Sequence, residues 1–152
     1  MQLKNLLLGI FLTSLIPYVT CAQDSGDSYG YVQKTQPAPV KRYCQTLQLK
    51  DDPELIAEYE KWHRSENIWK EITAGLKKVG VIDSEIYRHG TLLVMILTVP
   101  ADFDFEKQMG KLAGLPRQAE WEEFMSKYQA SDPDASSSEK WVQMKRIFKL
   151  DS

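Results

Sequence analysis

The chain has 152 residues, of which 43% are hydrophobic and 26% are charged, and its formal net charge is -2. This composition is typical of one globular domain and excludes a low-complexity or charge-dominated disordered polymer. No basic excess and no Lys/Arg-rich run is present, which argues against nucleic acid as a partner. With only Cys21, Cys44 and two histidines, we expect neither a disulfide framework nor a structural metal site.

The N-terminus has the features of a signal peptide over residues 1–22. An apolar run at 6–16 has the length of a signal-peptide core and is too short to span a bilayer. Thr20 and Ala22 meet the small-residue rule and predict cleavage after residue 22. Acylation of Cys21 is the alternative, although the residues before it are a poor approach to a lipidated cysteine. We therefore expect an exported chain, periplasmic or secreted, without a membrane span in its mature form.

Residues 23–39 are rich in Asp, Ser, Gly, Gln and Pro, have little to bury, and are expected to form a flexible linker. The folded domain is expected at 40–152. Cys44 is the only thiol left in the mature chain, and it lies in an alternating stretch with no His or basic pattern typical of a reactive cysteine. We interpret it as a small hydrophobic residue.

The first elements of the domain are a strand and a helix. Residues 42–49 alternate with a period of two, which predicts a strand. Asp52 followed by Pro53 is a strong helix start, with an N-cap acid and proline at the first helical position. Tyr59 and His63 follow on one stripe of this helix, and they lie one turn apart.

The middle of the domain is predicted to contain a second helix and a hairpin. An apolar face resumes over 68–79 and ends at Gly80. Residues 81–87 and 91–99 are expected to form two strands joined by Arg88, His89 and Gly90. The uninterrupted apolar run at 92–97 indicates a strand that is covered on both faces.

The C-terminal part is predicted to contain two short helices, around 105–112 and 121–128, then a polar loop at 131–139 and a last strand at 141–150. The resulting order is that of a ferredoxin-like α+β domain, β-α-β-β-α-β, with helices on one face of the sheet. Since the apolar strand needs cover on its other face, we expect two sheets to pack into a dimeric α/β barrel.

One pair of side chains could carry chemistry. Tyr59 and His63 would place a phenol beside an imidazole, a reasonable pair for moving a proton near neutral pH, although the same spacing also occurs in ordinary helix packing. Trp121 could stack on the apolar face of a sugar ring or belong to the core. Phosphate-binding loops, nucleophile elbows and metalloprotease motifs are absent from the sequence.

Six segments together resemble the L-rhamnose mutarotases over nearly all of residues 41–150. They are RYCQTLQL at 42–49, Tyr59-x-x-x-His63, NIWKEI at 67–72, EIYR at 85–88, LPRQAEWEEFM at 115–125 and SSSEKW before the predicted last strand. The family fold is the dimeric barrel that the pattern already suggested. Members interconvert the α and β anomers of L-rhamnose through the open aldehyde, without metal or cofactor.

The resemblance implies that His63 is the catalytic acid/base, that Tyr59 binds a sugar hydroxyl and that Trp121 lines the sugar pocket. Two further substrate-binding positions depart from the better-studied bacterial members. Ser84 stands where those members have a tyrosine, and Glu122 where they have a second tryptophan. Sugar identity is therefore expected to be open among L-rhamnose and similar 6-deoxy hexoses.

The leading hypothesis is an exported, homodimeric mutarotase of this sugar class. The alternative is a non-catalytic sugar-binding or interaction protein on the same dimeric barrel, which the changes at Ser84 and Glu122 would permit. A dimeric-barrel oxygenase shares the fold, but fold alone does not determine function.

Overall fold

The computed structural model describes residues 36–132, 135 and 137–150. The expected signal peptide at 1–22 and most of the expected linker at 23–39 lie outside these residues, so cleavage and export stay predictions. Within the described part, no helix combines the length and the apolar character needed to cross a membrane.

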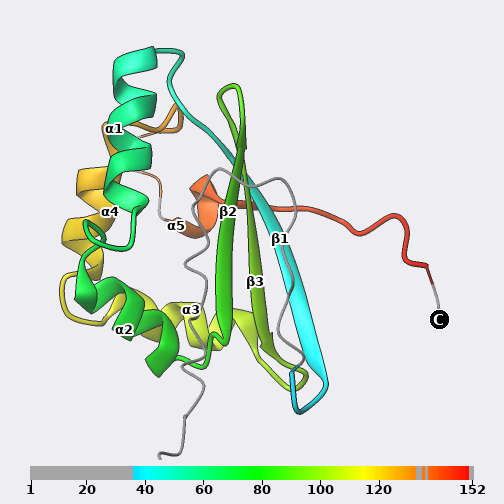
Figure 1. Ribbon diagram of the computed structural model, residues 1–152. Coiled ribbons are helices and arrows are strands. Elements are labelled where there is room, and N and C mark those ends of the chain that lie inside the picture. The colour runs from blue at the N-terminus through cyan, green and yellow to red at the C-terminus, as the bar shows by residue number, and fades with distance from the viewer. Residues whose placement is uncertain (1–35, 133–134, 136, 151–152) are drawn as a thin grey trace, which may run out of the picture. The chain divides into compact units, whose positions relative to one another are not determined.

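The described residues form a four-stranded antiparallel sheet with helices on one side (Figure 1). The sheet order is β2-β3-β1-β4, and this confirms the ferredoxin-like α+β fold. In chain order the elements are β1 (Val40–Gln48), α1 (Pro53–His63), α2 (Lys70–Lys78), β2 (Asp83–His89), β3 (Leu92–Pro100), α3 (Phe105–Ala113), α4 (Gln118–Ser126), α5 (Ser137–Lys140) and β4 (Val142–Gln143).

The start of α1 follows directly from its capping residues. Asp52 accepts hydrogen bonds from the backbone N–H groups of Glu54, at 2.9 Å, and Leu55, at 3.2 Å. Pro53 occupies the first turn, where its missing N–H costs nothing. These contacts fix the first residue of α1, which is eleven residues long and ends at His63.

The hairpin between β2 and β3 is tighter than the sequence predicted. The expected connection at 88–90 is wrong, because Arg88 and His89 pair with Leu93 and Leu92 as strand residues. Only Gly90 and Thr91 remain in the turn, and Gly90 has a φ of 59°, a conformation that costs glycine little. Arg88 is therefore a strand residue whose side chain lies on a defined face of the sheet, and it is not part of a loop.

The helix-facing side of β3 forms the centre of the core. Leu93, Leu97 and Val99 point to this side and are at most 2% exposed. Leu93 packs in one cluster with Tyr59 and Trp121, while Leu97 and Val99 belong to a second cluster with residues of α3. On the opposite face Val94 and Ile96 are only half-buried, so the described residues cover one face of this apolar strand and leave the other partly open.

The predicted last strand at 141–150 is largely wrong. Regular pairing is limited to Val142 and Gln143, which lie opposite Thr46 and Gln45 of β1, and residues 144–150 have no regular secondary structure. The short helix α5 begins inside the predicted polar loop and ends one residue beyond it. The apolar residues that alternate over 141–150 are all exposed, namely Val142, Met144, Phe148 and Leu150.

Truncation of Leu93 is expected to lower stability strongly, because this side chain is 1% exposed in the core cluster that holds Tyr59. Leu93→Ala is expected to lower the free energy of unfolding by about 2–5 kcal/mol, through lost burial and the cavity left behind. Equilibrium unfolding in urea measures this change in the free energy of unfolding. Lys111→Ala on the exposed side of α3 is the control, and a loss as small for Leu93→Ala as for the control would contradict the assignment of this core.

Candidate active site

The C-terminal end of α1 places an imidazole at the edge of the core. Tyr59 lies one turn before His63 and is 3% exposed, packed in the cluster that contains Leu47 and Leu93 of the sheet. Burial of Tyr59 fixes the rotation of α1 about its axis. Because residues four apart share a helix face, His63 is held on the same side, half-buried at the margin of the core.

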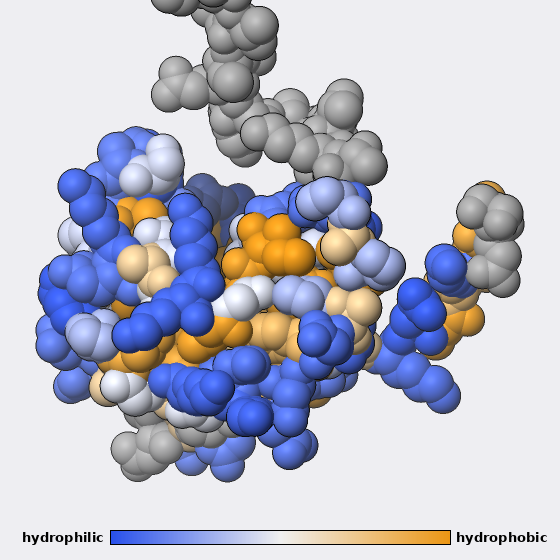
Figure 2. Space-filling view, turned by 90° about the horizontal axis from the view of Figure 1, so that it is seen from below, coloured by the Kyte–Doolittle hydropathy of each residue, from blue (hydrophilic) through white to orange (hydrophobic). Residues whose placement is uncertain are grey.

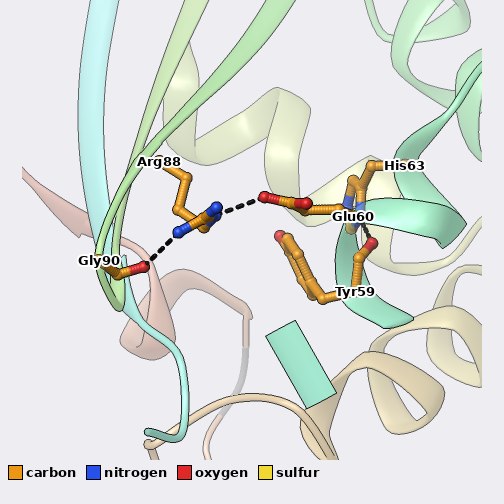
Figure 3. Close-up of polar contacts among 5 residues, drawn as sticks. All are labelled: Tyr59, Glu60, His63, Arg88 and Gly90. Atoms are coloured by element: carbon orange, nitrogen blue, oxygen red, sulfur yellow. Dashed lines mark hydrogen bonds and ion pairs between the residues drawn. The ribbon is translucent and has the colours of Figure 1, made fainter. Parts of the chain in front are cut away.

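A backbone hydrogen bond determines which nitrogen of His63 carries the proton. Nδ1 lies 2.9 Å from the carbonyl oxygen of Tyr59 (Figure 3). A carbonyl can only accept, so Nδ1 carries the hydrogen and donates it. In the neutral ring Nε2 then keeps its lone pair and is available as a proton acceptor.

Burial also favours the neutral form of this ring. Desolvation lowers the pKa of His63 below its ordinary value, and the hydrogen bond to the Tyr59 carbonyl opposes the shift only in part. At neutral pH the side chain is therefore an uncharged base with a free nitrogen.

Aromatic rings surround the imidazole and restrict its orientation. The ring centroids of Tyr59 and His63 are 4.1 Å apart, and the Trp121 ring contacts His63 edge-on at 5.5 Å. Trp121 is in turn supported by Trp69 at 5.2 Å, and the guanidinium of Arg117 covers the Trp69 ring at 3.9 Å. Packing of this kind keeps an acid/base group in one rotamer.

The hydroxyl group of Tyr59 is a hydrogen-bond donor at neutral pH. Burial raises the pKa of this phenol far above its usual range, so the proton stays on the oxygen. Within the described part of the chain no hydrogen bond joins this hydroxyl to another residue. In Figure 3 it points toward the side on which Arg88 and Glu60 lie.

The edge strand β2 has a strip that faces the helices without being covered by them. Ser84 lies opposite Leu97 and Arg88 opposite Leu93, which places both on the helix-facing side of the sheet, with Ile86 between them. All three nevertheless remain exposed, and Ile86 is 37% exposed despite its apolar side chain. We call Ser84, Ile86 and Arg88 the uncovered strip, because it leaves accessible surface beside α1.

An ion pair spans from this strip to α1. The Nε of Arg88 lies 2.5 Å from Oε1 of Glu60, and Nη1 donates to the carbonyl of Gly90 at 2.9 Å (Figure 3). Glu60 follows Tyr59 directly and lies one turn before His63. Analysis of the sequence missed this pair, since its members are 28 residues apart and only the segment EIYR drew attention to Arg88.

The structure brings together three of the five expected site residues, namely Tyr59, His63 and Trp121. Ser84 is exposed on the uncovered strip, and among the described residues no hydrogen bond joins it to His63. Glu122 is half-buried on α4 and accepts a hydrogen bond from Gln118 Nε2 at 2.9 Å. One oxygen of the Glu122 carboxylate therefore already accepts a hydrogen bond from the protein.

Two other features of the described residues lie apart from this centre. A surface cavity of about 430 Å³ is lined by residues 40–44 of β1 and by residues 143, 144 and 146, and it includes none of the five expected site residues. No cluster of three or more His, Cys, Asp or Glu side chains that could hold a metal ion occurs in the described part.

Fold and site together define a class of protein. A ferredoxin-like domain holds one neutral imidazole beside a phenol and an indole ring, an arrangement suited to moving a proton on a neutral, partly apolar small molecule. The family comparison agrees, since the model of the L-rhamnose mutarotase family matches residues 42–150. The chain belongs to this family of sugar mutarotases.

The chain is also similar to individual proteins and to a solved structure. The chain is 41% identical over 111 residues to an L-fucose mutarotase of Xanthomonas campestris pv. campestris, covering 73% of this chain and 89% of that protein. It is 38% identical over 115 residues to a UPF0734 protein of Dictyostelium discoideum, covering 73% and 90% respectively. The crystal structure of an L-rhamnose mutarotase from Formosa agariphila has the same fold, with a TM-score of 0.55, 20% identity, and coverage of 73% of this chain and 99% of that one.

The environment of His63 predicts a low imidazole pKa. Because the folded protein disfavours the charged ring, the NMR titration midpoint of His63 is expected below about 6.5, the ordinary value. The stability that the neutral ring contributes is present above this ordinary value and is lost as the pH falls below it. Only two histidines are present, so His63→Asn assigns the resonance by its disappearance. A midpoint above 6.5 would contradict the buried environment.

Proposed function

We propose that the protein interconverts the α and β anomers of a 6-deoxy hexose, with His63 as the acid/base. The observation that supports this most directly is the neutral imidazole with Nε2 unprotonated, held beside the rings of Tyr59 and Trp121. Membership of a mutarotase family makes anomer exchange the reaction to expect of this arrangement.

Each proton in the proposed reaction has a stated position. Nε2 of His63 takes the proton from the anomeric hydroxyl as the bond from the anomeric carbon to the ring oxygen breaks. The same nitrogen returns that proton to the ring oxygen, which gives the open aldehyde. Rotation about the adjacent carbon–carbon bond and closure on the other face of the carbonyl reverse these transfers. One well-placed acid/base is sufficient, because mutarotation also proceeds unaided in water.

The neighbouring groups would bind and orient the sugar. The Tyr59 hydroxyl stays protonated and can donate a hydrogen bond to a sugar oxygen. The Trp121 ring offers an apolar face to the C–H side of the ring. Ser84, exposed on the uncovered strip, and the half-buried Glu122 are proposed as further hydroxyl contacts. In Glu122 this contact would use the oxygen that Gln118 does not occupy.

Two sugars are the proposed substrates. The family model is that of L-rhamnose mutarotase, whereas the curated relative at 41% identity is an L-fucose mutarotase. Both sugars have an apolar methyl group at C6, and they differ in hydroxyl configuration at C2 and C4. Selection between the two sugars would therefore depend on contacts with their hydroxyl groups rather than on their size.

The proposal predicts faster exchange between the two anomeric protons of L-fucose or L-rhamnose when the purified protein is added in catalytic amount. Magnetisation-exchange NMR at anomeric equilibrium measures it. His63→Asn is expected to lower the exchange rate at least about a hundredfold, the usual range for removing a general acid/base. Tyr59→Phe keeps the core ring and tests only the hydroxyl. If the wild-type protein accelerates neither sugar, the proposed function is wrong.

We further propose that the chain forms a homodimer through the open face of the sheet. Val142 and Met144 lie on this face and are 58% and 49% exposed, and the following segment continues with apolar residues that are more exposed still. Figure 2 shows apolar residues at intervals along this segment, where it stands off the rest of the domain. Exposed apolar surface on a strand face and on the chain beyond it supports an interface between copies.

A dimer built in this way should dissociate when its apolar contacts are removed. Replacing Phe148, which is 76% exposed, by Asp is expected to shift the species seen in sedimentation velocity from dimer to monomer. The domain should stay folded, since this side chain is not part of either core cluster. A wild-type protein that sediments as a monomer at micromolar concentration would contradict the interface.

A further inference from the structure

The ion pair between Arg88 and Glu60 leaves most of its hydrogen-bonding capacity unused. The guanidinium carries five N–H groups, of which one at Nε contacts Glu60 and one at Nη1 contacts Gly90. Within the described residues, Nη2 of Arg88 and Oε2 of Glu60 have no hydrogen-bond partner. The pair therefore presents free donors on one side chain and a free acceptor on the other.

The geometry holds these free groups in a defined place. Two contacts fix the guanidinium at Nε and at Nη1, so little side-chain entropy remains to be lost when a ligand binds. The side chains are 36% and 44% exposed, which keeps both accessible. A fixed planar fork of donors beside a carboxylate matches two adjacent hydroxyl groups, which each donate one hydrogen bond and accept another.

The pair also lies next to the proposed reaction centre. Glu60 is adjacent in sequence to Tyr59, and Arg88 lies opposite Leu93, which packs in the same cluster as Tyr59 and Trp121. The Tyr59 hydroxyl points toward the ion pair (Figure 3). A sugar held with its anomeric carbon at His63 could therefore extend its other hydroxyl groups along the uncovered strip toward this pair.

We propose that Arg88 and Glu60 bind two adjacent ring hydroxyls of the sugar, away from the anomeric carbon, and so determine which 6-deoxy hexose is accepted. This inference rests on the proposed function. Arg88 donates from Nη2 to one hydroxyl oxygen, and Glu60 accepts at Oε2 from its neighbour. The contact is made equally in both anomers, so it acts on binding and on the choice of sugar rather than on the proton transfer at His63.

A purely structural role makes a different prediction. The ion pair also ties the end of the β2–β3 hairpin to α1, and loss of that tie alone would affect all sugars alike. Because exposed ion pairs contribute little to stability, removal of the pair should leave the domain folded. The two roles are therefore separable by comparing sugars that differ in single hydroxyl groups.

The experiment measures kcat and KM for anomer exchange with L-fucose, L-rhamnose and the single-deoxy derivatives of the preferred sugar, by exchange NMR over a range of sugar concentrations. The variants are Arg88→Leu, Arg88→Lys and Glu60→Gln. Glu58→Gln is the matched control, since Glu58 also lies on α1, is 43% exposed and pairs with Lys127 at 3.5 Å. Arg88→Lys keeps the positive charge and the fold but lacks the planar fork.

The proposal expects Arg88→Leu and Glu60→Gln to lower kcat/KM about tenfold to a hundredfold with the preferred sugar, mainly through KM, the range for a hydrogen bond to a charged group. Arg88→Lys should fall between wild type and Arg88→Leu, and Glu58→Gln should match wild type. With the deoxy derivative that lacks the bound hydroxyl, wild type and Arg88→Leu should become nearly equal. In the same variants, the ratio of kcat/KM between L-fucose and L-rhamnose should move closer to one.

Three results would overturn the inference. If an active Arg88→Leu protein keeps the wild-type KM and sugar selectivity, the ion pair does not contact the sugar. If kcat/KM falls equally with every sugar and every deoxy derivative, the ion pair only ties the hairpin to α1. If Arg88→Leu fails to fold, Arg88→Lys and Glu60→Gln take its place, and a wild-type KM and selectivity in both would equally exclude a contact between the ion pair and the sugar. Wild-type protein inactive toward all the sugars would instead remove the proposed function on which this inference depends.

Discussion

The hydrogen bond from His63 Nδ1 to the Tyr59 carbonyl is the interaction on which the candidate chemistry depends. It connects a side chain to the backbone of its own helix, so its geometry is set as soon as α1 forms and Tyr59 is buried. The bond leaves Nε2 as the free nitrogen, and desolvation keeps the ring neutral. If Nε2 carried the proton instead of Nδ1, the ring would present an N–H group in place of a base, with every other residue unchanged.

The rest of the domain positions this short helix against the sheet. Asp52 determines where α1 begins, and the cluster around Leu93 determines which of its faces is buried. In contrast to the buried face of α1, the helix-facing side chains Ser84, Ile86 and Arg88 of β2 are left uncovered. A domain that packed this edge as fully as its centre would have no accessible surface beside His63. The incomplete cover of β2 is therefore a structural condition for a binding site at this position.

Much of this architecture was predictable from local sequence signals. Alternation in β1, the Asp52–Pro53 start of α1 and the glycine of the hairpin each act over a few residues, and the structure confirms them. Tyr59 and His63 could be paired from helical spacing alone. What local patterns could not give was the partner of each segment. Alternation over 141–150 indicated a strand without indicating whether β1 would pair along its whole length, and it pairs for only two residues.

The same limit applies to the site. Trp121 could be either core or pocket from its sequence context. The structure places it in the core cluster, 7% exposed, with a T-shaped ring contact to His63, and its role in a pocket stays a prediction. The contact between Arg88 and Glu60 joins elements 28 residues apart and depends on Arg88 being the sixth residue of β2 rather than part of a turn. Shifting that strand by one residue would turn Arg88 to the other face. Register, which is a tertiary property, decides this contact.

The antiparallel pairing of β1 with β3 also has a kinetic consequence. These central strands join residues 40–48 to 92–100, and α1, α2 and β2 lie in the chain between them. The β2–β3 hairpin can form locally within microseconds, whereas the central pairing must close a loop that contains two helices. Tyr59, which lies within that loop, packs in one cluster with Leu47 of β1 and Leu93 of β3, so this cluster is complete only after that closure. The acid/base centre is thus assembled late in folding, and a partly folded chain with an intact hairpin still lacks it.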